Sequence, residues 1–291
     1  MRSRWIILIV ILAGAAVTAF AAGMAAFCAV AGRDSSVFGS RVGVITVKGP
    51  IISADDAVRD IAAMKRDDGV KAVVLRIETP GGSVGASQEI LEAVRLLAEV
   101  KPVVASMGSI AASGGYYLAC GATKILANPG TITGSIGVRM EHVAIGDLLR
   151  WAKVDVETLK SGRYKDIGSI DRPLGPEEKE ILQGVLDELR EQFKGTVAAA
   201  RNLPMEKVDA LADGRMFTGT RAVELGLVDG TGGFAEAIKL AAELGGIKGE
   251  PELSYPKKRG GWIKRMMEAA GGAAGSLAAS ADDHWRPAMK M

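Results

Sequence analysis

The sequence has few of the residues that build metal sites and disulfide frameworks. It contains only two cysteines, Cys28 and Cys120, and two histidines, His142 and His284, in 291 residues. Because Cys28 lies in an apolar N-terminal run, a single cysteine is left for the folded body, which excludes an intramolecular disulfide there. We expect Cys120 to be a small buried core residue. With no cluster of Cys and His, the chain offers no zinc-ligand spacing.

An excess of charge of one sign is also missing, and so are aromatic residues. The chain has 36 Lys+Arg and 34 Asp+Glu, a formal net charge of +2, which gives no electrostatic reason to expect a nucleic-acid partner. Aromatic residues make up 5% of the sequence, so the core must be built mainly from Val, Ile, Leu and Ala. That composition suits an α/β fold with buried strands. With 48% hydrophobic and 24% charged residues, we expect a globular chain rather than a disordered one.

A long run without charged side chains extends from Trp5 to Ala31, and two arginines precede it. The run exceeds the roughly 20 residues that a helix needs to cross a bilayer, so we expect residues 1–33 to form a single-pass membrane anchor. The preceding positive charge predicts a cytoplasmic N-terminus and an extracytoplasmic body. A cleaved signal peptide, with a normal apolar part of about 7–15 residues, is one alternative. A lipoprotein signal at Cys28 is another, although Phe27 is larger than the residue expected before a lipidated cysteine.

The rest of the chain divides into a linker at 34–41, a folded body at 42–249 and a C-terminal tail at 250–291. In the tail, basic residues surround Trp262 and Met266, and a Gly/Ala/Ser-rich stretch follows. We favour a disordered tail. A basic amphipathic segment that rests on lipid headgroups is the alternative.

The folded body alternates between strand and helix patterns. Apolar, β-branched runs predict strands at 42–47, 70–77, 102–107, 124–127, 135–138 and 155–159. Apolar residues at helical spacing predict helices at 55–65, 176–200, 204–211, 220–225 and 234–244, and one more that includes 90–98. Strands that alternate with helices indicate an α/β protein with repeated βα units.

Three loops at predicted strand ends collect glycine and hydroxyl residues, and ligands bind at such ends in parallel α/β folds. Gly81 and Gly82 form either part of an oxyanion hole or only a tight turn. Ser113 is either a nucleophile, with the Gly114 N–H group stabilising an oxyanion, or a helix cap, and the residues favour neither. Ser135 either hydrogen-bonds a catalytic lysine or is an ordinary turn serine.

A serine nucleophile needs a base, and the sequence offers two candidates. His142 belongs to the residue type most often used as a base. Lys165 is the other candidate, but a lysine accepts a proton only when its environment lowers its pKa, and most lysines are solvated surface charges. The residues alone leave both interpretations open.

Six short motifs follow one another along the body. They are Glu78–Val84, Ala111–Tyr117, Thr133–Val138, Ser161–Asp166, Ala212–Gly219 and Glu224–Asp229. Each is weak alone, but in this order and spacing, over roughly Val42 to Leu244, they resemble the signal peptide peptidase A family of Ser–Lys peptidases. The resemblance implies a Clp protease- and crotonase-like spiral of ββα units, a peptidase domain at 42–249, and no metal or cofactor.

The resemblance also assigns roles to the loop residues. It makes Ser113 the nucleophile, Lys165 the general base and Ser135 the residue that orients the lysine. The oxyanion hole then uses N–H groups near Gly81, Gly82 and Gly114.

For the whole protein, the resemblance implies a membrane-anchored endopeptidase that digests remnant signal peptides after their release from preproteins. Members of this length form homo-oligomeric rings with active sites between subunits, so the lysine can come from a neighbouring chain. Three alternatives stay open: a Clp-like peptidase that pairs Ser113 with His142, a crotonase-type enzyme acting on coenzyme A thioesters, and an inert membrane scaffold of the same fold. An extracytoplasmic location would deprive the second of cytosolic coenzyme A.

Overall fold

The computed structural model describes residues 40–256. The predicted membrane anchor, nearly all of the linker and most of the predicted tail lie outside the described residues. Within residues 40–256, no helix combines the length and the hydropathy that crossing a bilayer requires.

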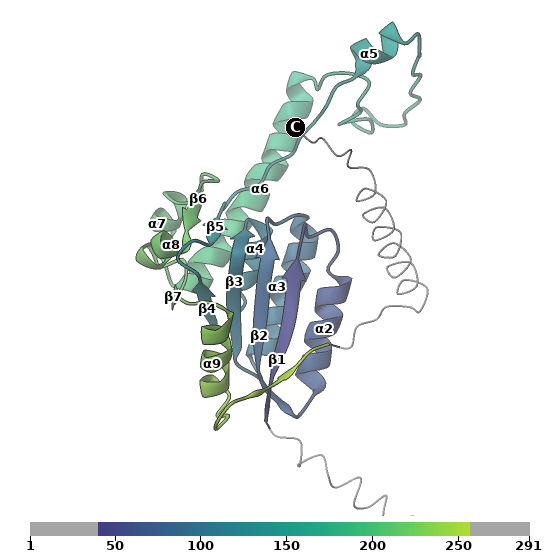
Figure 1. The fold of residues 1–291 in the computed structure, drawn as a ribbon. Helices are drawn as coiled ribbons and strands as arrows, with labels where there is room; N and C mark the ends of the chain where they lie inside the picture. The colour runs from purple at the N-terminus through teal and green to yellow at the C-terminus, as the bar shows by residue number, and fades with distance from the viewer. Residues whose placement is uncertain (1–39, 257–291) are drawn as a thin grey trace, which may run out of the picture. The chain divides into compact units, whose positions relative to one another are not determined.

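An eight-stranded sheet forms the centre of this part of the chain (Figure 1). Its strands are β1 (Arg41–Lys48), β2 (Val70–Thr79), β3 (Val103–Ala112), β4 (Lys124–Ala127), β5 (Ile132–Gly134), β6 (Met216–Thr218), β7 (Gly230–Thr231) and β8 (Glu252–Ser254). The main path runs β6-β5-β3-β2-β1-β8, and β4 connects β3 to β7. All pairs are parallel except β5 with β6. Since β8 pairs with β1, the sheet continues past residue 249, where the sequence predicted the folded body to end.

Helices cover both faces of the sheet. The helices of residues 40–256 are α2 (Asp55–Arg66), α3 (Val84–Ala98), α4 (Gly114–Ala119), α5 (Gly146–Trp151), α6 (Pro176–Arg201), α7 (Met205–Asp209), α8 (Gly219–Leu225) and α9 (Phe234–Leu244). Alternate side chains of a strand point to opposite faces. Val73 and Leu75 of β2 accordingly join the core under α2 and α3, whereas Ala72 and Val74 pack in a second core with α9. Burial on both faces explains why β2 reads as a nearly continuous apolar run, and it confirms the α/β prediction.

The structure corrects two predicted strands. The strand expected at 135–138 lies instead at Ile132–Gly134, because Ser135 adopts a positive φ of 52° and turns the chain out of the ladder. The strand expected at 155–159 is wrong: these residues have no ladder partner and are exposed. β3 is longer than predicted, because its first half pairs with β4 and its second half continues to Ala112 beside β5.

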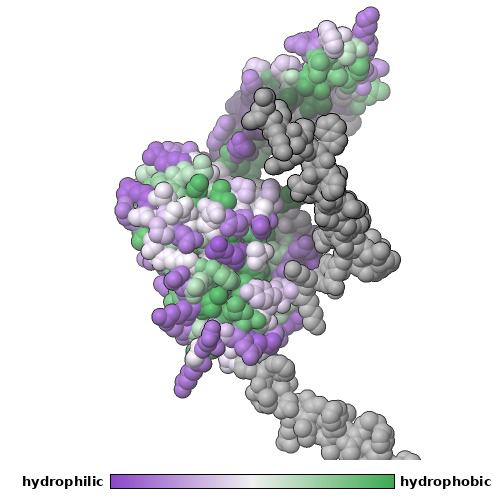
Figure 2. All heavy atoms as spheres, viewed as in Figure 1, coloured by the Kyte–Doolittle hydropathy of each residue, from purple (hydrophilic) through white to green (hydrophobic). Residues whose placement is uncertain are grey.

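Between β5 and α6 the chain runs out and back in a segment that we call the arm (residues 139–175). Its two sides are joined by hydrogen bonds from the Ile145 N–H group to the Ile170 carbonyl (2.7 Å) and between His142 Nε2 and the Arg172 carbonyl (3.1 Å). The arm contains α5 and lies at the N-terminal end of α6 in Figure 1. Apolar side chains gather on it (Figure 2), and Trp151 is 82% exposed. Such exposure is unusual for a side chain of this size.

Candidate active site

Ser113 lies where β3 passes into α4, in a strained backbone conformation. Its φ and ψ are 53° and −120°, a region that non-glycine residues occupy at a cost of about 1–3 kcal/mol. Two hydrogen bonds hold it there: its N–H group donates to the Gly134 carbonyl (2.9 Å), and its carbonyl accepts from the Tyr117 N–H group (2.8 Å). Strand β5 and helix α4 therefore fix Ser113 from both sides.

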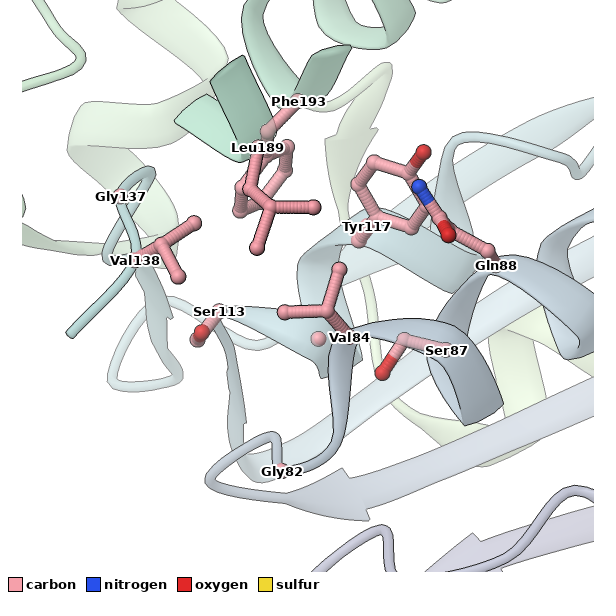
Figure 3. Close-up of a pocket in the computed structure, with 11 residues that line it drawn as sticks. Gly82, Val84, Ser87, Gln88, Ser113, Tyr117, Gly137, Val138, Leu189 and Phe193 are labelled. Atoms are coloured by element: carbon pink, nitrogen blue, oxygen red, sulfur yellow. The ribbon is translucent and has the colours of Figure 1, made fainter. Parts of the chain in front are cut away.

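The Ser113 hydroxyl makes no capping hydrogen bond to α4, although Ser113 is the N-cap residue. The helix-cap interpretation of this serine is therefore wrong. Ser113 is half-buried and lines two adjoining hollows, in which Figure 3 shows its side chain beside Val84 and Val138. The arrangement leaves the hydroxyl available for chemistry.

Backbone from the β2–α3 loop packs directly against Ser113. Gly81 has a φ of +99°, and a Cβ atom there would lie 2.7 Å from the Gly114 nitrogen and 2.9 Å from Ser113 Cβ. A Cβ atom on Gly82 would lie 2.1 Å from the Ile51 carbonyl oxygen. Both positions therefore admit only glycine.

The predicted oxyanion-hole donors differ in how they are used. The Gly81 N–H group donates to Thr79 Oγ1 at 3.1 Å, so Gly81 contributes close approach of the backbone rather than a free donor. The N–H groups of Gly82 and Gly114 have no acceptor among residues 40–256. Both glycines line the hollow beside Ser113.

Ser135 lies in the same cleft as Ser113. Its positive φ is stabilised by the 213–215 turn, because its N–H group donates to the Arg215 carbonyl (2.9 Å). Within that turn Arg215 Nε donates to the Asp213 carboxylate at 2.8 Å, and the hydrogen bonds from Arg215 lower the pKa of Asp213 to about 2. The structure thus brings the predicted nucleophile and the predicted lysine-orienting serine into one site.

The cleft that contains Ser113 and Ser135 has a volume of about 820 Å³. It is lined by the loop after β2, the turn at Ser113, the segment after β5, α6 and the 213–215 turn. Beside it lies a small apolar pocket of about 30 Å³. Its side chains come from separate elements and include Val84, Tyr117, Val138, Leu189 and Phe193 (Figure 3). The Tyr117 and Phe193 rings meet edge to face, with centroids 4.8 Å apart. The sequence did not identify this pocket, and its only signal was the apolar stripe of α6.

Neither candidate base lies beside Ser113. Lys165 is exposed in the arm, and it lines neither hollow next to the nucleophile. His142 also lies in the arm and contacts the Arg172 carbonyl. Within the described residues of one chain, Ser113 therefore has no adjacent base.

Cys120 is buried in the core, as predicted. Burial raises the pKa of its thiol to about 12, which makes it a poor nucleophile. No group of three or more His, Cys, Asp or Glu side chains within residues 40–256 is arranged to hold a metal ion.

Two family models match this chain. The family model of peptidase family S49 matches residues 95–248, more than half of the chain. The chain belongs to peptidase family S49. The family model of Clp protease matches residues 41–133, which fits the α/β sheet and the Clp-like fold expected from the sequence. The residues that the S49 model matches include Ser113, Ser135 and Lys165.

The relatives of this chain include proteins that are named as proteases, one of them as a serine protease. The chain is 52% identical over 176 residues to a Synechocystis protein that is named as a protease, covering 60% of this chain and 64% of the relative. It is 37% identical over 210 residues to the chloroplastic serine protease SPPA of Arabidopsis thaliana, covering 72% and 31%. It is 34% identical over 238 residues to protease 4 of Salmonella typhi, covering 81% and 38%. The resemblance to the signal peptide peptidase A family is confirmed, and the chain spans less than two thirds of each of these relatives.

Proposed function

We propose that this protein is a membrane-anchored serine endopeptidase in which Ser113 is the nucleophile and Lys165 is the general base. The observation that carries the proposal is the local geometry of Ser113. The Ser113 backbone is strained and its hydroxyl makes no capping hydrogen bond. It lies close to Ser135 and to the N–H groups of Gly82 and Gly114, which have no acceptor among residues 40–256. These are the nucleophile and the oxyanion donors that acyl transfer needs.

In the proposed reaction, the neutral Lys165 amine accepts the Ser113 proton while Oγ forms a bond to the carbonyl carbon of the scissile peptide. The negative charge that develops on the carbonyl oxygen is stabilised by the Gly82 and Gly114 N–H groups, each worth about 3 kcal/mol. The carbon–nitrogen bond then breaks, and the lysine returns the proton to the departing amine. Water, deprotonated by the same lysine, then attacks the acyl carbon, the ester bond to Ser113 Oγ breaks, and the lysine returns the proton to Oγ.

We place the lysine of each site on a neighbouring subunit of a homo-oligomeric ring. Two features of the single chain support this. Lys165 is exposed in the arm and lines neither hollow beside Ser113. The same arm exposes large apolar side chains, with Trp151 82% and Leu159 91% exposed. A subunit contact would cover that surface, and burial in the contact would favour a neutral lysine.

We propose remnant signal peptides as the substrates. The apolar pocket beside Ser113 suits the aliphatic side chains in which signal peptides are rich. The cleft of about 820 Å³ has room for several residues of an extended peptide. An anchor formed by residues 1–33 would hold the domain at the lipid surface, where cleaved signal peptides remain.

The alternative with His142 as the base receives less support. His142 Nε2 contacts the Arg172 carbonyl, so reaching a serine would require this contact to break. An inert scaffold of the same fold would have no use for a strained serine whose hydroxyl caps nothing.

The proposal is tested with the full-length protein and a synthetic signal peptide. We expect Ser113→Ala and Lys165→Ala to abolish hydrolysis and His142→Ala to retain it. A fluorophosphonate should label Ser113 in the unmodified protein and fail to label Ser113→Ala. Loss of activity in His142→Ala together with retention in Lys165→Ala would show that histidine is the base, and absence of any labelling would favour the inert scaffold.

A further inference from the structure

The residues on either side of Lys165 are hydrogen-bonded to α6, Tyr164 directly and Asp166 through Arg172, whereas the Lys165 side chain is not. The Tyr164 hydroxyl donates to Glu177 in the first turn of α6. On the other side, Asp166 accepts hydrogen bonds from Lys160 Nζ (2.6 Å) and from Arg172 (3.1 Å). The Lys165 amine has no hydrogen-bond or ion-pair partner in the part of the chain that the structure describes.

Arg172 connects the lysine loop to the helix. Its two terminal nitrogens donate to the two Glu178 carboxylate oxygens at 2.7 and 2.6 Å, and one of them also donates to Asp166. Glu178 in turn accepts from the Gly175 N–H group at 2.8 Å. A paired, two-bond contact between guanidinium and carboxylate fixes orientation as well as distance. We call Asp166, Arg172 and Glu178 the clamp.

The two carboxylates of the clamp are shielded from solvent, whereas the Arg172 side chain is 35% exposed. The Asp166 and Glu178 side chains are only 12% and 11% exposed, whereas Lys165 one position away from Asp166 is exposed. Exposed ion pairs hold geometry poorly. Shielded pairs with several charge-assisted hydrogen bonds have few alternative partners, so they hold it well.

We infer that Asp166, Arg172 and Glu178 are positioning residues that aim Lys165 at the active site it serves. This inference rests on the proposed function, because it assumes that Lys165 is the base. The lysine amine sits on a flexible four-carbon stem, so its reach is defined only if its backbone is fixed. The clamp fixes that backbone to the first turn of α6 in its own chain. The clamp residues touch no reacting atom.

The experiment measures kcat and KM of the full-length protein with a fluorogenic coumarin-amide peptide that carries leucine at the cleaved bond. We expect Asp166→Asn and Glu178→Gln each to lower kcat by up to about 100-fold, as small displacements of a catalytic group do, with little change in KM. Because both carboxylates act through Arg172, the double variant should be no worse than the poorer single variant. Asp166→Glu, which keeps the charge, should recover part of the lost kcat.

Asp229→Asn is the matched control. Asp229 also pairs with two cations, Arg201 (2.9 Å) and Lys124 (3.2 Å), and accepts from a backbone N–H group, but it lines neither hollow beside Ser113. We expect this variant to keep its kcat. All variants are also compared in melting temperature and oligomeric mass, so that a loss of kcat can be separated from lost stability or lost assembly.

The inference is overturned if the clamp variants keep the kcat of the control, or if they lose activity only in proportion to lost stability or lost assembly. The proposed function is judged separately by Lys165→Ala in the same assay. If Lys165→Ala is inactive and Asp166→Asn is fully active, the positioning role of the clamp is refuted and the proposed function is retained. If Lys165→Ala is active, both the positioning role of the clamp and the role of Lys165 as the base are refuted.

Discussion

The strained turn at Ser113 is packed closely by neighbouring backbone, which is possible because the residues that touch it are glycines. Gly81 approaches Ser113 and Gly114 so closely that a single added carbon would sit 2.7 Å from a backbone nitrogen. The strain of about 1–3 kcal/mol at Ser113 is therefore offset by packing and by the two backbone hydrogen bonds to β5 and α4. The active geometry depends on shape as much as on reactive groups.

Gly81→Ala should inactivate the enzyme without touching any reactive atom. The new methyl group would displace the Ser113 turn, and alanine is strained at a φ of +99°. We expect kcat/KM to fall by about 100-fold or more and stability to fall by more than about 1 kcal/mol.

Gly85→Ala is the control for this change. Gly85 lies in α3, with open space where its Cβ atom would be, and alanine is the better helix former by about 0.5–1 kcal/mol. Hydrolysis assays and thermal melts should show normal activity and equal or higher stability. An active Gly81→Ala would mean that the Ser113 turn tolerates displacement.

At single residues, the sequence located the candidate site but could not decide roles. The glycine and serine loops were recognisable because small residues followed predicted strands. Whether Ser113 capped α4 depended on side-chain direction, and the commitment of the Gly81 N–H group to Thr79 depended on loop geometry. The pocket was missed because Val84, Val138 and Phe193 come from separate elements, and a sequence pattern does not show which elements meet.

At the scale of elements, the long buried elements and some short ones, such as β4 and α8, were predicted to within a residue or two, whereas short elements in the loops after β4 and in the arm were not. β1, β2, α2, α6 and α9 lie close to their expected bounds, because their apolar spacing is repeated over several turns or residues. The strand expected at 155–159 failed because apolar residues there face solvent in the arm. The stripe of α6 is also only partly covered: Phe193 is 5% exposed, but Ile181 is 39% exposed. Periodicity predicts a face that packs against other residues, and within residues 40–256 part of the apolar face of α6 is uncovered.

The arm should lose its order in acid before the sheet does. Hydrogen bonds from Lys160 and Arg172 lower the pKa of Asp166 from 3.8 to about 2, and hydrogen bonds from Arg172 and Gly175 lower the pKa of Glu178 from 4.5 to about 2. Groups with lowered pKa values contribute stability that is complete above their ordinary pKa and lost as the pH falls through the folded value. The window for this loss is therefore pH 4.5 to about 2.

Hydrogen–deuterium exchange, corrected for the intrinsic effect of pH, tests this. Peptides from residues 160–175 should be protected at pH 6 and lose protection below about pH 4, while β2 and β3 stay protected. In Asp166→Asn the same peptides should already exchange faster at pH 6. Equal protection of the arm at pH 6 and pH 2.5 would contradict the role given to these carboxylates.

At the scale of the whole molecule, two observations favour the proposed homo-oligomer. The nucleophile has no base within reach among the described residues, and the arm exposes a tryptophan and several aliphatic side chains. A homo-oligomer in which the arm of one subunit covers its neighbour would account for both. The exposed apolar surface of the arm and the lack of a base beside Ser113 would then have one explanation.

Trp151→Asp should weaken this assembly. A charge at the centre of a packed contact is costly to bury, so we expect smaller assemblies by mass photometry and a parallel loss of hydrolysis. Val100→Asp serves as the control, because Val100 is also exposed (57%) but follows α3, outside the arm. An unchanged mass for Trp151→Asp would place the subunit contact elsewhere.

The central claim is that Ser113 of one subunit reacts with the help of Lys165 from another. Co-expression of full-length Ser113→Ala with full-length Lys165→Ala, each carrying a different tag, tests it most directly. Each variant alone should be inactive, whereas mixed assemblies purified through both tags should hydrolyse the peptide. In them, the intact serine of one chain meets the intact lysine of its neighbour. Mixed assemblies that contain both chains and remain as inactive as either variant would contradict the account.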